Sequence, residues 1–201
     1  MAIVMSTTIN AKSLANSVDQ QPVLVFQIVN SADVPGEVLA HAQKHVQRIY
    51  QELGIRTVWV ERDGAPEALS GAKRLHLRIV LVNELVAGAM GKGNATGFAL
   101  SNNGSGARIA YIFNERAEHQ AEFVSELRPV NKEVLHGLIL GHVIAHEAGH
   151  LMLPPNGHSS TGIMRSKMDM DSVDRALQGR LLFQPEQQKL IRAALMAQAK
   201  N

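Results

Sequence analysis

The segment 146–150 reads His-Glu-Ala-Gly-His and lies inside an apolar run that is typical of a helix. Residues four apart lie on one face of a helix, so the imidazoles of His146 and His150 can reach the same metal ion. Glu147 stands beside the first histidine and can hold a water molecule at the metal without binding the metal itself. The pattern therefore predicts a metal site with a carboxylate suited to hydrolysis.

A third histidine follows this segment. His158 comes eight residues after His150, and Met164 comes six residues later. Three imidazoles, one carboxylate and one open coordination position are typical of a hydrolytic zinc site. We therefore expect one zinc ion per chain, with His146, His150 and His158 as ligands and Glu147 as the general base.

Other interpretations of these histidines are less economical. A helix with surface histidines is one alternative, but the neighbouring residues are apolar, and buried imidazoles need polar partners. His142 is a further candidate ligand, although we expect it to support the site or the core, because such sites take their third ligand from beyond the helix. If His158 is not the third ligand, the alternatives are Asp169, Asp171 and Asp174.

This set of residues resembles the metzincin clan of zinc peptidases, which combine HExxH, a third histidine and a methionine turn. The chain departs from the usual pattern HExxHxxGxxH. Leu153 stands at the glycine position, Asn156 at the usual third-ligand position, and His158 comes two residues later. Pro154 is expected to end the helix, and the Pro-Asn-Gly that follows can make the turn that the glycine usually provides.

The resemblance implies a zinc-dependent endopeptidase acting on peptide or protein substrates, with Met164 packed beneath the metal. It also implies that an edge strand before the metal helix pairs with the substrate, and the matching residues are Phe98, Ala99 and Leu100. A metal-dependent hydrolase of a non-peptide substrate such as RNA and a non-catalytic zinc-stabilised binding module remain alternatives. The presence of Glu147 argues against both.

The elements that must position these residues follow from periodicity and turn signals. Strands are expected at 23–29, 55–60, 74–82, 98–100 and 108–113, and helices at about 35–53, at about 131–153 and from 185 onward. Metzincin domains show this order. The resemblance thus implies an α/β (α+β) domain with a twisted, mostly parallel five-stranded sheet, an antiparallel edge strand, an active-site helix and a C-terminal helix.

Length and composition agree with one domain. The chain has 201 residues, is 45% hydrophobic and carries a net charge of +2, which is too small to indicate a nucleic-acid partner. We expect a flexible arm over residues 1–20 and a single zinc-peptidase domain over 21–201. No apolar run predicts a membrane helix, and residues 1–21 do not resemble a signal peptide. A complete chain would then be cytoplasmic, and a mature or trimmed form secreted.

Overall fold

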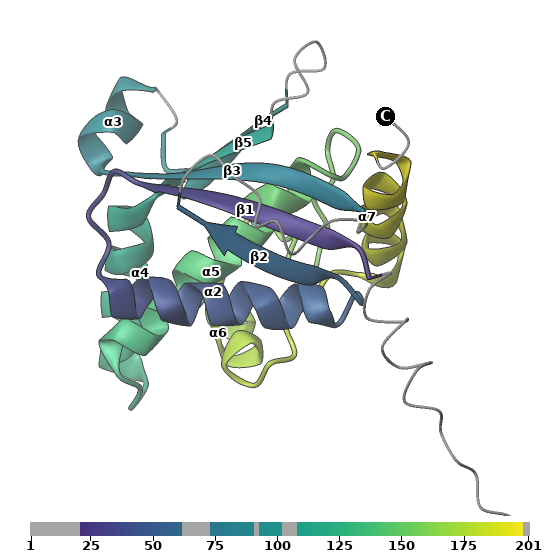
Figure 1. Cartoon of the computed structure of the whole chain (residues 1–201). Coiled ribbons are helices and arrows are strands. Elements are labelled where there is room, and N and C mark those ends of the chain that lie inside the picture. Colours follow the sequence, from purple (N-terminus) through teal and green to yellow (C-terminus); the bar gives the residue numbers. More distant parts are fainter. Residues whose placement is uncertain (1–20, 62–72, 91–92, 102–107, 199–201) are drawn as a thin grey trace, which may run out of the picture.

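A mixed sheet lies at the centre of the structure, a computed structural model that describes residues 21–61, 73–90, 93–101 and 108–198 (Figure 1). The strand order is β2-β1-β3-β5-β4, and β4 is antiparallel to β5 while the other pairs are parallel. The predicted five-stranded, mostly parallel sheet with an antiparallel edge strand is therefore confirmed. The strands are β1 (Val23–Asn30), β2 (Arg56–Val60), β3 (Arg74–Val82), β4 (Gly97–Ser101) and β5 (Arg108–Phe113).

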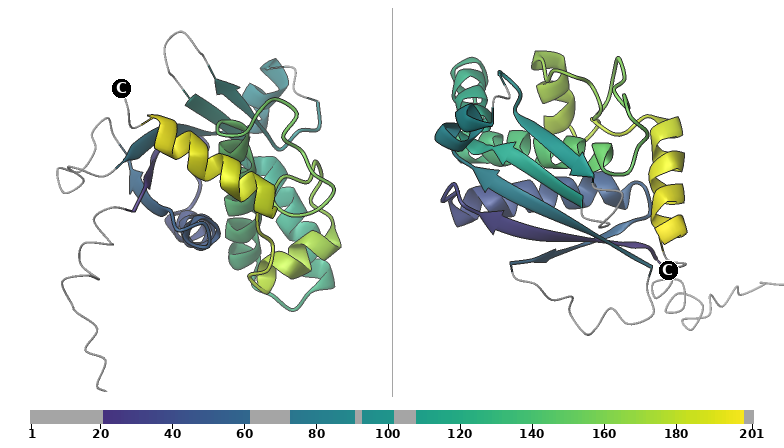
Figure 2. Two further views of the ribbon diagram at one scale, coloured as in Figure 1. Left: turned by 90° about the vertical axis from the view of Figure 1, so that its right-hand side faces the viewer. Right: turned by 90° about the horizontal axis from the view of Figure 1, so that it is seen from above.

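The helices place most of the core on one face of this sheet. α2 (Gly36–Gln51), α4 (Asn114–Leu127) and α5 (Lys132–His150) lie side by side beneath the strands, and α7 (Pro185–Gln198) stands at one end (Figures 1 and 2). Alternate leucines and isoleucine of β3 point into this core, as its period-two pattern predicts. None of the described helices is long and apolar enough to cross a membrane.

α5 is the buried helix that carries the candidate metal ligands. Asn131 caps it by accepting a hydrogen bond from the backbone N–H of Val134, and nearly every residue from Leu135 onward is buried. The helix packs closely against α2, because a Cβ atom at Gly141 would lie 2.7 Å from the carbonyl oxygen of Ala42. Such a close crossing fixes the position of the helix relative to the sheet.

Three helices within the described part of the chain were not predicted from the sequence. They are α3 (Glu84–Ala89), α4 and α6 (Met170–Leu177). α6 follows Asp169, its N-cap, and contains Asp171 and Asp174, the other two aspartates considered as alternative third ligands. The predicted arm at 1–20 lies outside the described residues.

Candidate metal centre

Three imidazole rings converge at the C-terminal end of α5. The Nε2 atom of His150 lies 3.1 Å from that of His146 and 3.1 Å from that of His158, and the remaining pair is 3.3 Å apart. Among the described residues, these histidines form the group that could hold a metal ion. Three ring nitrogens aimed at one point suit a cation that accepts all three lone pairs, so the donor set fits zinc.

The protonation states of these rings favour metal binding. Burial lowers the pKa of His146, and burial together with the neighbouring imidazoles lowers the pKa of His150 to about 4. Both rings are therefore neutral near pH 7, and a neutral imidazole offers the lone pair that a metal requires.

The turn around Met164 orients the first ligand. The ring nitrogen Nδ1 of His146 lies 2.8 Å from the carbonyl oxygen of Ile163. A carbonyl oxygen can only accept, so Nδ1 carries the proton and Nε2 keeps its lone pair for the metal. This contact could not be predicted from a residue pattern, because it joins two segments through a backbone atom.

Met164 lies beneath the ligands and is fully buried. A Cβ atom at Gly149 would lie 2.5 Å from the sulfur of Met164, so the glycine of the motif leaves room for the thioether between the two ligands of α5.

Hydrogen bonds on both sides of His158 hold the segment that carries it in place. Gln187 of α7 donates to the carbonyl oxygen of Gly157 at 3.1 Å, and the N–H of Ser159 donates to the carbonyl oxygen of Met164 at 2.9 Å. These bonds close the loop over the end of α5. Gln187 was missed by sequence reasoning, since a lone glutamine on a terminal helix carries no recognisable pattern.

Glu147 is a buried carboxyl beside the histidines. It is 6% exposed, and burial raises its pKa to about 7. Its side chain lies against the start of β4, because a Cβ atom at Gly97 would be 2.9 Å from its Cγ and 3.2 Å from its Oε1. A buried carboxyl favours a positive neighbour, which a bound metal ion would supply.

Replacing Gly97 with alanine should therefore disturb catalysis more than zinc binding. The added methyl group would overlap Glu147 and also lie 2.9 Å from the carbonyl oxygen of Tyr111, so the carboxylate must move. We expect kcat to fall by at least about tenfold with zinc content unchanged, because general-base catalysis needs the carboxylate within hydrogen-bond reach of water. Gly88→Ala is the matched control, since a Cβ there meets no atom within 4 Å. Equal turnover by the two variants would contradict the assigned position of Glu147.

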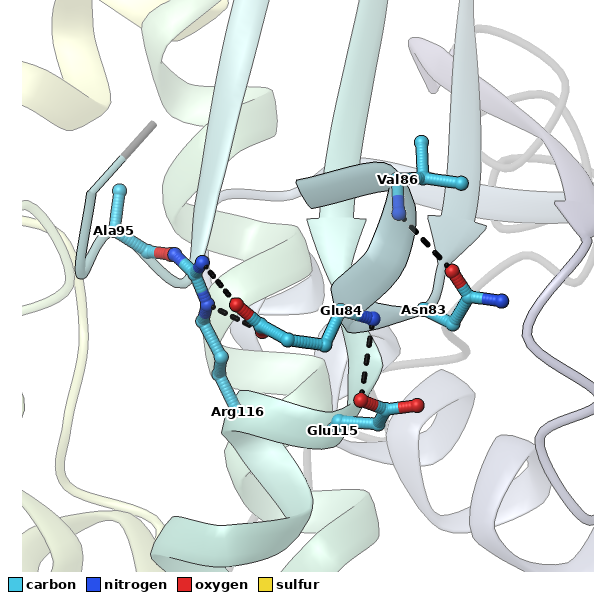
Figure 3. A network of polar contacts seen from close by, with 6 residues as sticks. All are labelled: Asn83, Glu84, Val86, Ala95, Glu115 and Arg116. Carbon is cyan, nitrogen blue, oxygen red and sulfur yellow. Dashed lines mark hydrogen bonds and ion pairs between the residues drawn. The ribbon is translucent and has the colours of Figure 1, made fainter. Parts of the chain in front are cut away.

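The histidines and Glu147 lie in a cleft of about 810 Å³. Residues 94–99 line it, as do Arg165, Lys167 and Met168. The rim before β4 is fixed by Arg116, which binds both carboxylate oxygens of Glu84 and donates to the carbonyl oxygen of Ala95 (Figure 3). This ion pair had no sequence signal, because its partners lie 32 residues apart.

The predicted substrate strand is β4, and its free edge lies at the cleft. The N–H of Phe113 donates to the carbonyl oxygen of Thr96, so by alternation the hydrogen-bonding groups of Ala99 point away from β5. Phe98 and Ala99 line the cleft, whereas Leu100 does not and is 50% exposed. Among the described strands β4 is the last in the sheet order and pairs with β5 alone, so it is not a central strand of this sheet.

The three aspartates considered as alternatives to His158 lie away from the candidate metal group. Asp169 caps α6 by accepting from the N–H of Ser172 and pairs with Arg165, and Asp174 pairs with Arg128. Asp171 is exposed. None of these aspartates belongs to the candidate metal group among the described residues.

Comparison with known proteins gives little beyond the structure itself. No family model matches the chain, and no curated protein matches it. A crystal structure of a zinc-dependent peptidase from Methanocorpusculum labreanum (strain Z) is similar with a TM-score of 0.46 and 15% sequence identity, covering 84% of this chain and 99% of that one. A structural similarity this weak does not indicate an activity. The function is therefore inferred from the site.

Proposed function

We propose that this protein is a zinc-dependent endopeptidase that binds extended peptides along β4. The observation that carries the proposal is the convergence of three imidazole nitrogens beside the buried carboxyl of Glu147, within a cleft bordered by a free strand edge. His146, His150 and His158 would hold one zinc ion per chain. A methionine turn beneath them agrees with the metzincin-like character that the sequence implies.

The zinc ion and the protein side chains would contribute different parts of the hydrolysis. A zinc ion held by the three histidines would supply Lewis acidity, which would polarise the substrate carbonyl and make water easier to deprotonate. Glu147 takes the proton from the attacking water and passes it to the leaving amine as the peptide bond breaks. The contact of His146 with Ile163 keeps the ligand ring in the required orientation.

The strand edge supports a peptide substrate in particular. The outward N–H and C=O groups of β4 offer regularly spaced partners, to which an extended peptide can add as one more strand. A substrate bound in this way is read mainly through its backbone. This edge favours a peptide over RNA, and the carboxyl at the metal site favours an enzyme over a binding module.

Chelation of the metal tests the proposal against both alternatives. Zinc-loaded protein, chelated protein and protein with zinc restored are each incubated with casein and with RNA. We expect casein cleavage that is lost with chelator and restored by zinc, and no RNA cleavage. Zinc-dependent cleavage of RNA alone would indicate the non-peptide hydrolase. Zinc-dependent stabilisation without any cleavage would indicate the binding module.

Replacing Ala99 with proline tests where the substrate binds. Proline removes the outward N–H of residue 99 and leaves the metal ligands unchanged. We expect KM to rise several-fold while zinc content and thermal stability stay close to wild type. Leu100→Pro is the contrasting variant, because the N–H of Leu100 belongs to the ladder with β5, and it should lower stability instead. An unchanged KM in a folded Ala99→Pro protein would contradict pairing along this edge.

A further inference from the structure

Positive charge is concentrated in one segment of the cleft lining. Apart from the histidines and Glu147, the charged side chains that line the cleft within the described part of the chain are Arg165 and Lys167. Both belong to the short segment that follows Met164. The lining residues in and before β4, which are 94–99 and Ser101, contribute only uncharged side chains. A substrate side chain that reaches the segment 165–168 would therefore meet cationic groups.

The two cations differ in their partners. Arg165 Nη1 lies 2.5 Å from one carboxylate oxygen of Asp169, so the charges of this pair largely cancel at a distance. The other carboxylate oxygen of Asp169 accepts hydrogen bonds from the N–H and the hydroxyl of Ser172, which keep the aspartate in place. Lys167 is exposed and forms no ion pair with any other described residue. The unbalanced positive charge of this segment is thus that of Lys167.

Hydrogen bonds hold the backbone on both sides of Lys167. On one side, the N–H of Ser159 donates to the carbonyl oxygen of Met164 at 2.9 Å. On the other side, Nε2 of Gln120 in α4 donates to the carbonyl oxygen of Met168 at 2.9 Å, and Met168 also packs against the hydrophobic core. The side chain of Lys167 can move, but the backbone to which it is attached is fixed beside the cleft.

We propose that Lys167 selects peptides that carry a glutamate or aspartate side chain near the scissile bond. The inference rests on the proposed peptidase function, in which β4 binds the backbone of the substrate. Backbone pairing with a strand edge is the same for most sequences, so selectivity must come from side chains. An ammonium group beside the cleft attracts a carboxylate and repels a second ammonium. Because water screens a pair at an exposed position, we expect a preference of about two- to fivefold for one charge.

Peptide sets that differ in a single charge test this selection. Each peptide has blocked ends and an otherwise uncharged sequence, with one glutamate, glutamine or lysine placed at each position in turn. For zinc-loaded wild type we expect kcat/KM at one position near the cleavage site to fall from glutamate to glutamine to lysine, by about two- to fivefold at each step. The difference should lie mainly in KM, because the ion pair forms equally in the bound substrate and in the transition state. Equal values for glutamate and glutamine at every position would overturn the proposal.

Charge changes at residue 167 show whether Lys167 is the cation responsible. Lys167→Arg should keep the wild-type order of peptides, Lys167→Met should bring the three kinds close to equality, and Lys167→Glu should reverse the order. Zinc content should be the same in all of them. Lys44→Glu is the matched control, because it makes the same charge change at an exposed residue of α2 that does not line the cleft. The wild-type order in Lys167→Glu, or a reversed order in the control, would overturn the assignment.

Binding without hydrolysis separates this proposal from the peptidase function. Zinc-loaded Glu147→Ala is titrated with the same peptides carrying a neutral fluorescent label, and Kd is measured by fluorescence anisotropy. We expect Kd to be lowest for glutamate and highest for lysine. The differences should shrink at about 1 M salt, where the Debye length is only about 3 Å. Equal Kd for the glutamate and glutamine peptides would overturn the selection even if the wild type cleaves peptides. A wild type that cleaves no peptide, together with the expected order of Kd, would refute the peptidase function and leave the selection by Lys167 supported.

Discussion

Replacing Glu147 with alanine should give a folded, zinc-loaded protein that has lost nearly all peptide hydrolysis. The change removes the group that accepts the proton from water and leaves the three histidines untouched. A general base contributes about 10²–10⁴-fold to the rate, so a loss of that order is expected in kcat. The measurement is turnover of a peptide substrate, accompanied by zinc analysis of the same sample.

A second variant separates the proton transfer from packing effects. Glu147 is buried, so Glu147→Gln, which keeps the size of the side chain, should lose activity to a similar extent with a smaller loss of stability. Turnover within about twofold of wild type in either zinc-loaded variant would show that Glu147 is not the base.

Replacing His158 with alanine should sharply reduce zinc affinity. Only two imidazoles would remain, and a zinc ion in a site of this kind takes three protein ligands. We expect the purified variant to hold much less than one zinc per chain and to lose activity in parallel. His119→Ala is the matched control, because it removes an exposed histidine that lies outside the metal group.

Full zinc content in His158→Ala would contradict this ligand assignment. The ion would then need another third ligand, and Asp169 and Asp174 could serve only by giving up their ion pairs with Arg165 and Arg128. The loop that carries His158 is held by Gln187, so no rearrangement of the wild-type loop is needed to present this imidazole.

The histidine cluster could be predicted from the sequence because its three members are close together along the chain. A spacing of four residues places His146 and His150 on one helical face in any helix. His158 follows after a short loop, and a short loop limits how far its imidazole can lie from the other two. The five strands were also predictable, since β1 is a continuous apolar run and β3 alternates with period two.

The parts that were missed depend on contacts between distant segments. Glu147 fits against Gly97, and Arg116 pairs with Glu84, across separations that no periodic pattern encodes. The unpredicted helices had weak signals of their own. α4 turns mainly small residues such as Ala117 and Ala121 towards the core, and α6 has only eight residues.

Mass spectrometry of a defined peptide mixture shows whether this protein is a zinc-dependent endopeptidase that uses Glu147. Zinc-loaded wild type and zinc-loaded Glu147→Ala, prepared in the same way, are incubated with the mixture, and new termini inside the peptides are counted over time. We expect internal cleavage by the wild type, little or none by the variant, and none by wild type after chelation. Intact peptides in the zinc-loaded wild-type sample, or the same cleavage sites and rates in both proteins, would contradict it.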